Sequence, residues 1–128
     1  MASLPAIHEG ATGRFTAYLL DEDGVAIASA SVSAITMTLR HRFSNTIVNS
    51  RSAQNVFNTN NCTLHATSGL FTWNVQTADA AIVDNSNPPR DIDEHEMILT
   101  ATYTATGPLT KVAKHKEIIR VVNLTRTP

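Results

Sequence analysis

The sequence GLFTWNV, residues 69–75, carries the clearest strand pattern of the chain and decides the fold class. Phe71, Trp73 and Val75 occupy alternate positions, with polar residues between them. Apolar residues at every second position favour a β-strand that buries one face. Trp73 is the only tryptophan of the chain, and a large aromatic side chain in the middle of such a strand is typical of a core between two sheets. The segment therefore predicts a β-sandwich with Trp73 in its core.

Other segments repeat this alternation and complete the expected fold. Residues 13–20, 33–41 and 96–104 alternate in the same way, and residues 110–123 form either one long strand or a strand pair. Shorter strands are expected at residues 46–49 and 54–58, residues 63–66 lead into the strand of Trp73, and a helical turn is expected at residues 77–81. The large apolar residues of the inward positions form the expected core: Ile35, Met37, Leu39, Phe71, Trp73, Leu99 and Tyr103. Short strands with no long helix predict an all-β antiparallel sandwich of seven to eight strands, with a small closed β-barrel as the alternative.

Composition limits the classes of function. The chain has 128 residues, which is the size of one domain, and 16% of them are charged, with a formal net charge of −1. We expect no nucleic-acid partner, because the sequence has no basic stripe, and no membrane partner or export signal, because it has no long apolar run. The expected division is an N-terminal arm (residues 1–12), a sandwich domain (residues 13–123) and a C-terminal tail (residues 124–128).

Candidate chemistry is sparse. A single cysteine, Cys62, excludes an internal disulfide. Asp91, Asp93 and His95 alternate, a spacing that fits either a metal site or the polar edge of a loop. The acidic turn at residues 21–24 resembles the start of a calcium loop but lacks the final glutamate. No nucleophile–base motif or phosphate-binding loop is present, so we predict no catalytic, cofactor-binding or metal-binding residues and no enzymatic activity.

The order of these patterns resembles the immunoglobulin-like domains of tailed-bacteriophage virion proteins, in particular the N-terminal domain of the phage baseplate upper protein family. The resemblance covers residues 15–122. It rests on five stretches: residues 19–27, 34–40 (AITMTLR), 68–73 (SGLFTW), 77–79 (TAD) and 97–103. It implies an immunoglobulin-like sandwich in a non-enzymatic structural protein of the virion, such as a capsid decoration, neck or baseplate component. The alternative is a cellular carbohydrate-binding or adhesion module, which would need a row of exposed aromatic side chains.

The same resemblance implies partners and a location. The protein would be synthesised in the host cytoplasm and assembled into the virion, where it contacts other capsid, neck or baseplate subunits and forms a homo-oligomer. Six residues are candidate assembly contacts: Leu4 and Ile7 in the arm, Arg40 and Arg42 in a small basic cluster, and Ile118 and Val122 on the second apolar face of the last strand. That strand is apolar on both faces, so we expect it to lie in a sheet centre or against a neighbouring subunit.

Overall fold

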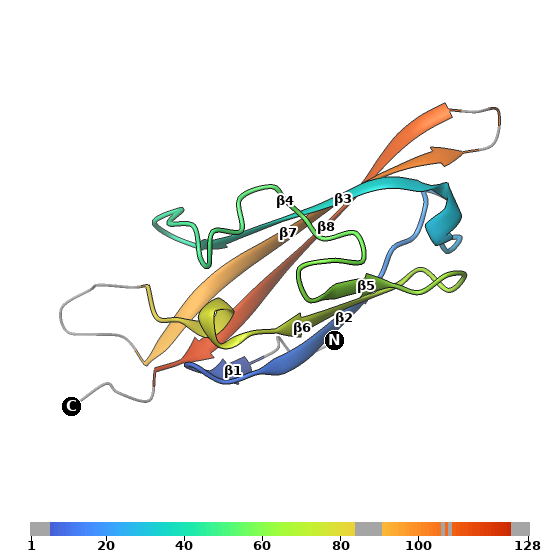
Figure 1. The fold of residues 1–128 in the computed structure, drawn as a ribbon. Helices are drawn as coiled ribbons and strands as arrows, with labels where there is room; N and C mark the ends of the chain where they lie inside the picture. Colours follow the sequence, from blue (N-terminus) through green and yellow to red (C-terminus); the bar gives the residue numbers. More distant parts are fainter. Residues whose placement is uncertain (1–5, 84–90, 106, 108, 124–128) are drawn as a thin grey trace.

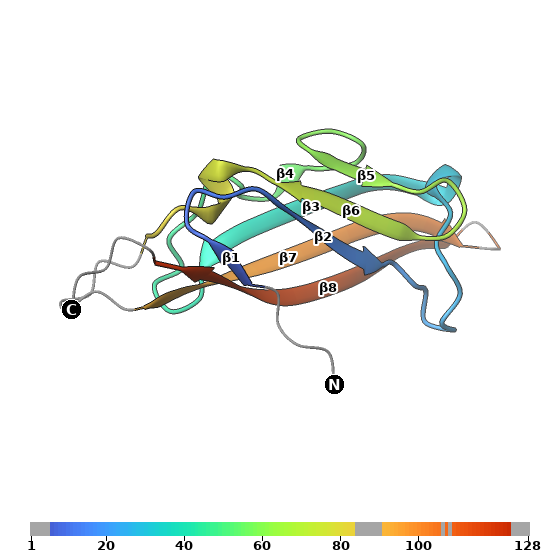
Figure 2. The ribbon, with the colours of Figure 1, turned by 90° about the horizontal axis from the view of Figure 1, so that it is seen from below.

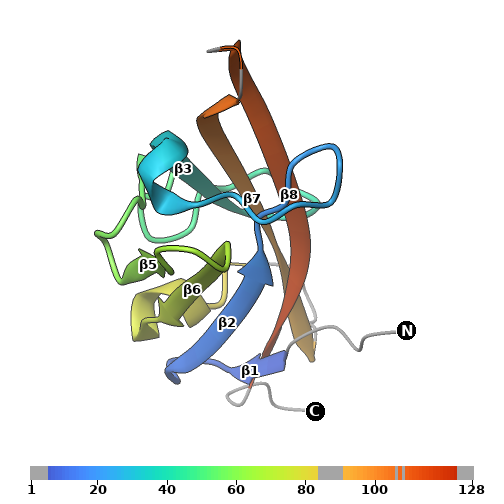
Figure 3. The ribbon, with the colours of Figure 1, turned by 90° about the vertical axis from the view of Figure 1, so that its right-hand side faces the viewer.

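A computed structural model describes residues 6–83, 91–105, 107 and 109–123 of the chain. Within this part the protein is all-β, with two sheets packed face to face (Figure 1, Figure 3). The strands are β1 (Ala6–His8), β2 (Gly13–Tyr18), β3 (Val32–His41), β4 (Gln54–Asn55), β5 (Cys62–Leu64), β6 (Leu70–Val75), β7 (Ile92–Ala105) and β8 (Leu109–Val122). Two short 3₁₀ turns, η1 (Ser29–Ser31) and η2 (Thr77–Ala80), join them.

The strand order is that of an immunoglobulin-like sandwich. The larger sheet runs β1-β8-β7-β3-β4 and the smaller runs β2-β6-β5. Strands β8-β7-β3-β4 correspond to G-F-C-C′ of the immunoglobulin fold, and β2-β6-β5 to B-E-D. The predicted fold class is therefore confirmed. Trp73 lies in β6, the position of strand E, whereas the antibody-type tryptophan lies in strand C.

The core forms between the inward residues of the two sheets. In the smaller sheet, β2 pairs with β6 so that Phe15 lies opposite Trp73. Their rings meet edge to face, with centroids 6.3 Å apart and an interplanar angle of 67°, an arrangement favoured by aromatic quadrupoles. All seven predicted core residues are buried, each at most 6% exposed. The period-two pattern thus identified the buried face of β3, β6 and β7 correctly.

Strand β1 corrects the expectation that residues 1–12 form an arm outside the core. Ala6, Ile7 and His8 pair in parallel with Arg120, Val121 and Val122 of β8, which they flank in Figure 2. Ile7 also packs against the core cluster. This segment lacks the alternation of a longer strand because it is only three residues long and depends on β8 for its hydrogen bonds. Residues 1–5 and 124–128 lie outside the described residues.

Two further boundaries differ from the prediction. β7 begins at Ile92, although the acidic stretch before Glu96 was expected to be a loop. The carboxylates of this stretch are compatible with a strand, because each has an ionic partner. Asp93 pairs with His41 of β3, and Glu94 pairs with Arg42, the residue after β3. The strand expected at residues 46–49 is also absent from this described segment, where only Ile47 forms an isolated bridge, to Arg40.

The chain between β3 and β5 is irregular instead of extended. Every described non-glycine residue with a positive φ angle lies between positions 45 and 61, and most of these residues are asparagine. Asparagine adopts the left-handed backbone conformation more readily than most side chains. The described chain has no helix with the length and apolar character that crossing a bilayer requires.

Candidate functional site

The most concentrated polar chemistry lies at one end of the sandwich, where β3 ends and β7 begins. His41 is the last residue of β3 and lies opposite His95 of β7, and Asp93 precedes His95 by two positions on the same face. These three residues, which we call the His-Asp-His cluster, are between 0% and 6% exposed. Buried polar groups of this kind require internal partners, because leaving them unsatisfied is costly.

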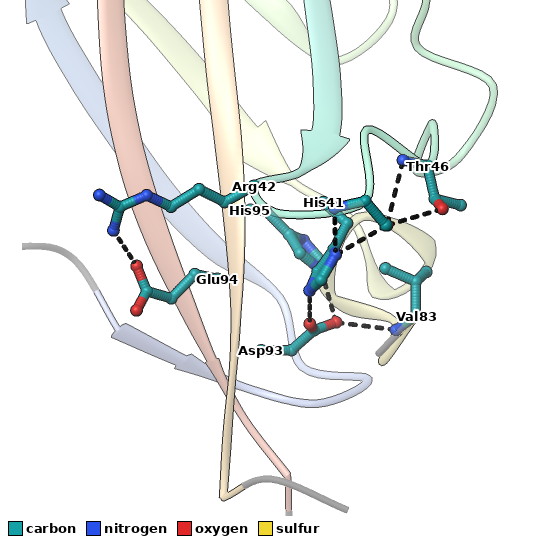
Figure 4. A network of polar contacts seen from close by, with 8 residues as sticks. His41, Arg42, Thr46, Val83, Asp93, Glu94 and His95 are labelled. Atoms are coloured by element: carbon teal, nitrogen blue, oxygen red, sulfur yellow. Dashed lines mark hydrogen bonds and ion pairs between the residues drawn. The ribbon is translucent and has the colours of Figure 1, made fainter. Parts of the chain in front are cut away.

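Asp93 provides those partners (Figure 4). Its Oδ1 lies 2.9 Å from Nε2 of His41, and its Oδ2 lies 3.0 Å from Nε2 of His95. The backbone N–H of Val83 also donates to Oδ2, at 2.7 Å. One carboxylate therefore connects β3, β7 and the segment that follows η2.

Ser44 fixes the tautomer of His41. The Ser44 N–H donates to Nδ1 of His41 at 3.2 Å, so this nitrogen carries a lone pair and the ring proton lies on Nε2, facing Asp93. The Ser44 hydroxyl is also 2.8 Å from the same Nδ1. Nδ1 of His95, on the other side, is buried and has no partner among the described residues. Nε2 of His95 is hydrogen-bonded to Oδ2 of Asp93, whereas Nε2 of His41 lies at ion-pair distance from Oδ1, which has no hydrogen-bond partner among the described residues.

The electrostatics of the cluster favour an ionised aspartate. Burial alone would raise the pKa of Asp93. The hydrogen bonds from His95 and from the Val83 N–H, with the electrostatic attraction of the two imidazoles, outweigh burial and hold this pKa below its ordinary value. The cluster therefore stabilises a buried negative charge at the end of the sandwich.

Ser44, His41 and Asp93 form a serine–histidine–aspartate constellation that sequence analysis did not anticipate. The contact between His41 and Ser44 is a local hydrogen bond within the turn, because Nδ1 of His41 accepts the backbone N–H of Ser44, three residues later in the chain. The Ser44 hydroxyl is held at 2.8 Å from the Thr46 hydroxyl and accepts the Thr46 N–H at 3.3 Å. These bonds close the turn after β3, and Nδ1 of His41 lies 2.8 Å from the Ser44 hydroxyl while it also accepts the Ser44 N–H.

The described residues of this region do not combine into the ligand set of a metal. Asp91 precedes β7, whereas Asp93 and His95 lie within it. Asp91 is exposed, in contrast to the two buried residues with which it alternates. Among the described residues, no group of three or more histidine, cysteine, aspartate or glutamate side chains is arranged to hold a metal ion.

A second buried cluster, which sequence analysis missed, surrounds Arg51 and Asp79, each 2% exposed. Nε of Arg51 donates to Oδ1 of Asp79 at 2.6 Å, and the guanidinium carbon lies 5.7 Å from the centroid of the Trp73 ring. Arg51 also donates to Gln54 at 2.8 Å and to the carbonyl oxygen of Asn60 at 3.2 Å. This residue therefore fixes the irregular chain between β3 and β5 to the core.

The predicted assembly contacts fall into two groups. Arg40 and Arg42 lie at the end of β3, beside Glu96 and Glu94 of β7 at 2.6 Å and 2.5 Å, and Ile118 of β8 lies opposite Glu96. Arg40 and Lys116 both contact Glu96, and the hydrogen bond from Arg40 is the main reason that the pKa of Glu96 is lowered. These residues share the outer face of the larger sheet.

The remaining candidates lie elsewhere. Ile7 packs on the core, and Val122 accepts the backbone N–H of Glu9 at 2.9 Å where β8 ends. Leu4 lies outside the described residues.

The sequence held a signal for the burial of His41, because this residue continues the inward positions 35, 37 and 39 of β3.

Comparison of the chain with models of known protein families, with curated proteins and with solved structures finds no match.

Proposed function

We propose that the chain is a non-enzymatic structural module of a tailed-bacteriophage virion, a capsid decoration, neck or baseplate component that acts through protein–protein contacts. Its partners would be other virion subunits and further copies of itself within the particle. The resemblance of residues 15–122 to immunoglobulin-like virion domains, together with the sandwich fold, supports this class of function.

The observation that carries the proposal is the distribution of polar and apolar groups. The polar clusters are buried and serve to connect strands, so they are poorly placed to act on a substrate. Large apolar side chains, in contrast, are exposed on the β7–β8 hairpin, which projects beyond the other strands (Figure 1). Leu109 and Val112 are 56% and 55% exposed there. Three positions apart on one strand, these two side chains point to opposite faces, so each face of the projecting hairpin offers an exposed apolar side chain for contact with another subunit.

A carbohydrate-binding module is the weaker alternative, because the exposed aromatic side chains are separated. Tyr18 is 62% exposed and Phe43 is 63% exposed. Tyr18 ends β2, close to the turn at residues 21–23, and this turn lines a pocket together with the C-terminal end of β7. Phe43 follows β3, which ends beside the N-terminal part of β7. Two aromatic rings at opposite ends of a long strand do not form a stacking platform.

Sedimentation tests the structural role. When lysates of the source material are fractionated on a density gradient, the protein should travel with particles and remain there after a high-salt wash. Recovery of the protein only in the soluble fractions would contradict the proposal. The non-enzymatic part has its own test, labelling with a fluorophosphonate. We expect no covalent labelling of the protein. Labelling that the substitution Ser44→Ala abolishes would contradict the non-enzymatic role.

A further inference from the structure

The outer edge of β8 is largely unpaired. β7 pairs with β8 along the full length of that strand, from Leu109 to Val122. On the other side, β1 pairs only with Arg120, Val121 and Val122 (Figure 2). In the described part of the chain, no other strand pairs with positions 109–119 on this side. Such an edge presents a row of backbone donors and acceptors to a partner.

The backbone groups that face this edge can be identified. The carbonyl oxygen of Val122 accepts the N–H of Glu9 on the β1 side, and the N–H of Asn123 donates to Asp91 on the β7 side. Because the N–H and C=O of successive strand residues point in alternate directions, even-numbered residues direct both groups toward the open edge. These residues are Thr110, Val112, Lys114, Lys116 and Ile118.

Two of these positions carry lysine, and the outer face of the sheet beside them is also basic. Lys114, Lys116 and Arg120 alternate on the outer face of β8, and Arg40 and Arg42 lie on β3 or directly after it. Only two acidic residues interrupt this face among the described strands, Glu94 and Glu96 of β7. Five basic residues against two acidic ones contrast with the formal net charge of −1 of the whole chain. The basic residues come from two separate segments, residues 40–42 and 114–120, which only the pairing of the strands brings to one face.

The inner side of the same edge is partly apolar near the end of β8. A pocket of about 380 Å³ lies between β1, β2 and β8; Ile7, Phe15 and Ile119 line it together with the polar residues His8, Thr12 and Arg14. A strand added beside β8 would direct alternate side chains toward this pocket and the others toward the lysines. The edge therefore favours a segment in which acidic and apolar residues alternate.

We propose that the open edge of β8 accepts an extended, acidic segment of a partner protein as an additional strand. Backbone hydrogen bonds to the even-numbered residues supply binding, and carboxylates opposite Lys114 and Lys116 supply selectivity. Edge-to-edge pairing of two copies through β8 is disfavoured, because it brings lysines of the two copies close together. The inference rests on the proposed role in protein–protein contacts, for which it defines the partner's chemistry.

A short peptide that alternates glutamate and valine is the probe, with a lysine–valine peptide as its control. Titration of the isotopically labelled full chain, followed by NMR, should give saturable shifts. The amides of the five even-numbered residues should become protected from hydrogen exchange, and those of the odd-numbered residues should not change. Lack of protection at millimolar glutamate–valine peptide would overturn the proposal. Equal binding of the lysine–valine peptide would do the same. So would tighter binding of inorganic polyphosphate with no amide protection, which would indicate a general polyanion surface.

Variants separate charge from strand addition. Lys114→Glu combined with Lys116→Glu should weaken peptide binding about tenfold, whereas Lys111→Glu, on the same strand but paired with Glu22 on the other face, should change it little. Val112→Pro removes an outward N–H without affecting the pairing with β7 and should reduce both binding and amide protection. Full binding by Val112→Pro would overturn strand addition. This experiment uses the isolated protein, so it can fail while particle sedimentation succeeds, and the reverse.

Discussion

The substitution Asp79→Asn should be one of the most destabilising conservative changes in this protein. Four donors reach the carboxylate: Nε of Arg51 at 2.6 Å, a second guanidinium nitrogen at 3.2 Å, the Asn49 amide at 2.8 Å and the Gln76 N–H at 2.9 Å. An asparagine amide keeps the shape but directs an NH₂ group at two of these donors. It also leaves the buried guanidinium of Arg51 without a counter-charge.

The expected cost follows from these contacts. Removing one partner of a buried ion pair costs about 3–5 kcal/mol. For a domain of this size, that loss corresponds to a decrease in Tm of roughly 10–20 °C. Thermal unfolding followed by fluorescence is a suitable assay, because the only tryptophan lies directly beside Arg51.

The pH dependence provides a second readout of the same substitution. Burial would raise the pKa of Asp79, but the hydrogen bonds from Arg51, Asn49 and Gln76 outweigh it and hold the pKa below its ordinary value of 3.8. A lowered folded-state pKa contributes stability that is fully present above the ordinary pKa and is lost as the pH falls through the folded-state value. The stability difference between wild type and Asp79→Asn should therefore narrow in acid.

Glu22→Gln is the matched control for Asp79→Asn. The Glu22 side chain pairs with Lys111 but is 66% exposed, so its substitution should cost less than about 1 kcal/mol. A loss below about 1 kcal/mol for Asp79→Asn itself would refute the role assigned to the Arg51–Asp79 pair.

Three other predictions concern single residues. Gly69→Ala should lower the free energy of unfolding by at least about 2 kcal/mol, because φ is +73° and a Cβ would lie 2.6 Å from the carbonyl oxygen of Leu19. The control Gly24→Ala has a φ of +77° but no atom within 4 Å of the added Cβ, so it should cost only about 1–2 kcal/mol. Equal losses of stability for the two variants in chemical denaturation would contradict this reasoning. Burial raises the pKa of the Cys62 thiol to about 12, so the native protein should not react with a thiol reagent at neutral pH, and rapid modification would indicate an accessible thiolate. Asp93→Asn should lower the free energy of unfolding in urea by about 2–4 kcal/mol at neutral pH. The difference in stability from the wild type should be smaller in acid, because the pKa of Asp93 is lowered in the folded protein. An unchanged urea midpoint would show that the His-Asp-His cluster contributes no stability.

The sequence predicted the strands that alternate regularly, because burial of one face imposes a period of two on their residues. β3 and β6 match their predicted positions closely, and the core includes every expected large apolar residue. β1 was not expected, because three residues are too few to show a period. β7 extends further toward its N-terminus than its apolar residues indicate, since Asp93 and His95 occupy inward positions that normally carry apolar side chains.

The polar clusters were less accessible to sequence reasoning, because their members are distant in the chain. Arg51 and Asp79 are 28 positions apart, and neither belongs to a recognisable motif. His41 meets Asp93 only because β3 and β7 pair in one particular register. Similarly, the basic face of the larger sheet collects residues from two distant segments, 40–42 and 114–120. Long-range pairing, rather than local pattern, determines each of these features.

The central claim, that this sandwich is a structural subunit of a virion, is tested most directly by an electron-microscopy map of the particle that contains the protein. We expect density for the eight-stranded sandwich at repeated, symmetry-related positions, with a neighbouring subunit contacting the edge of β8. A map of intact particles from the source, with every subunit assigned and none of them this sandwich, would contradict it.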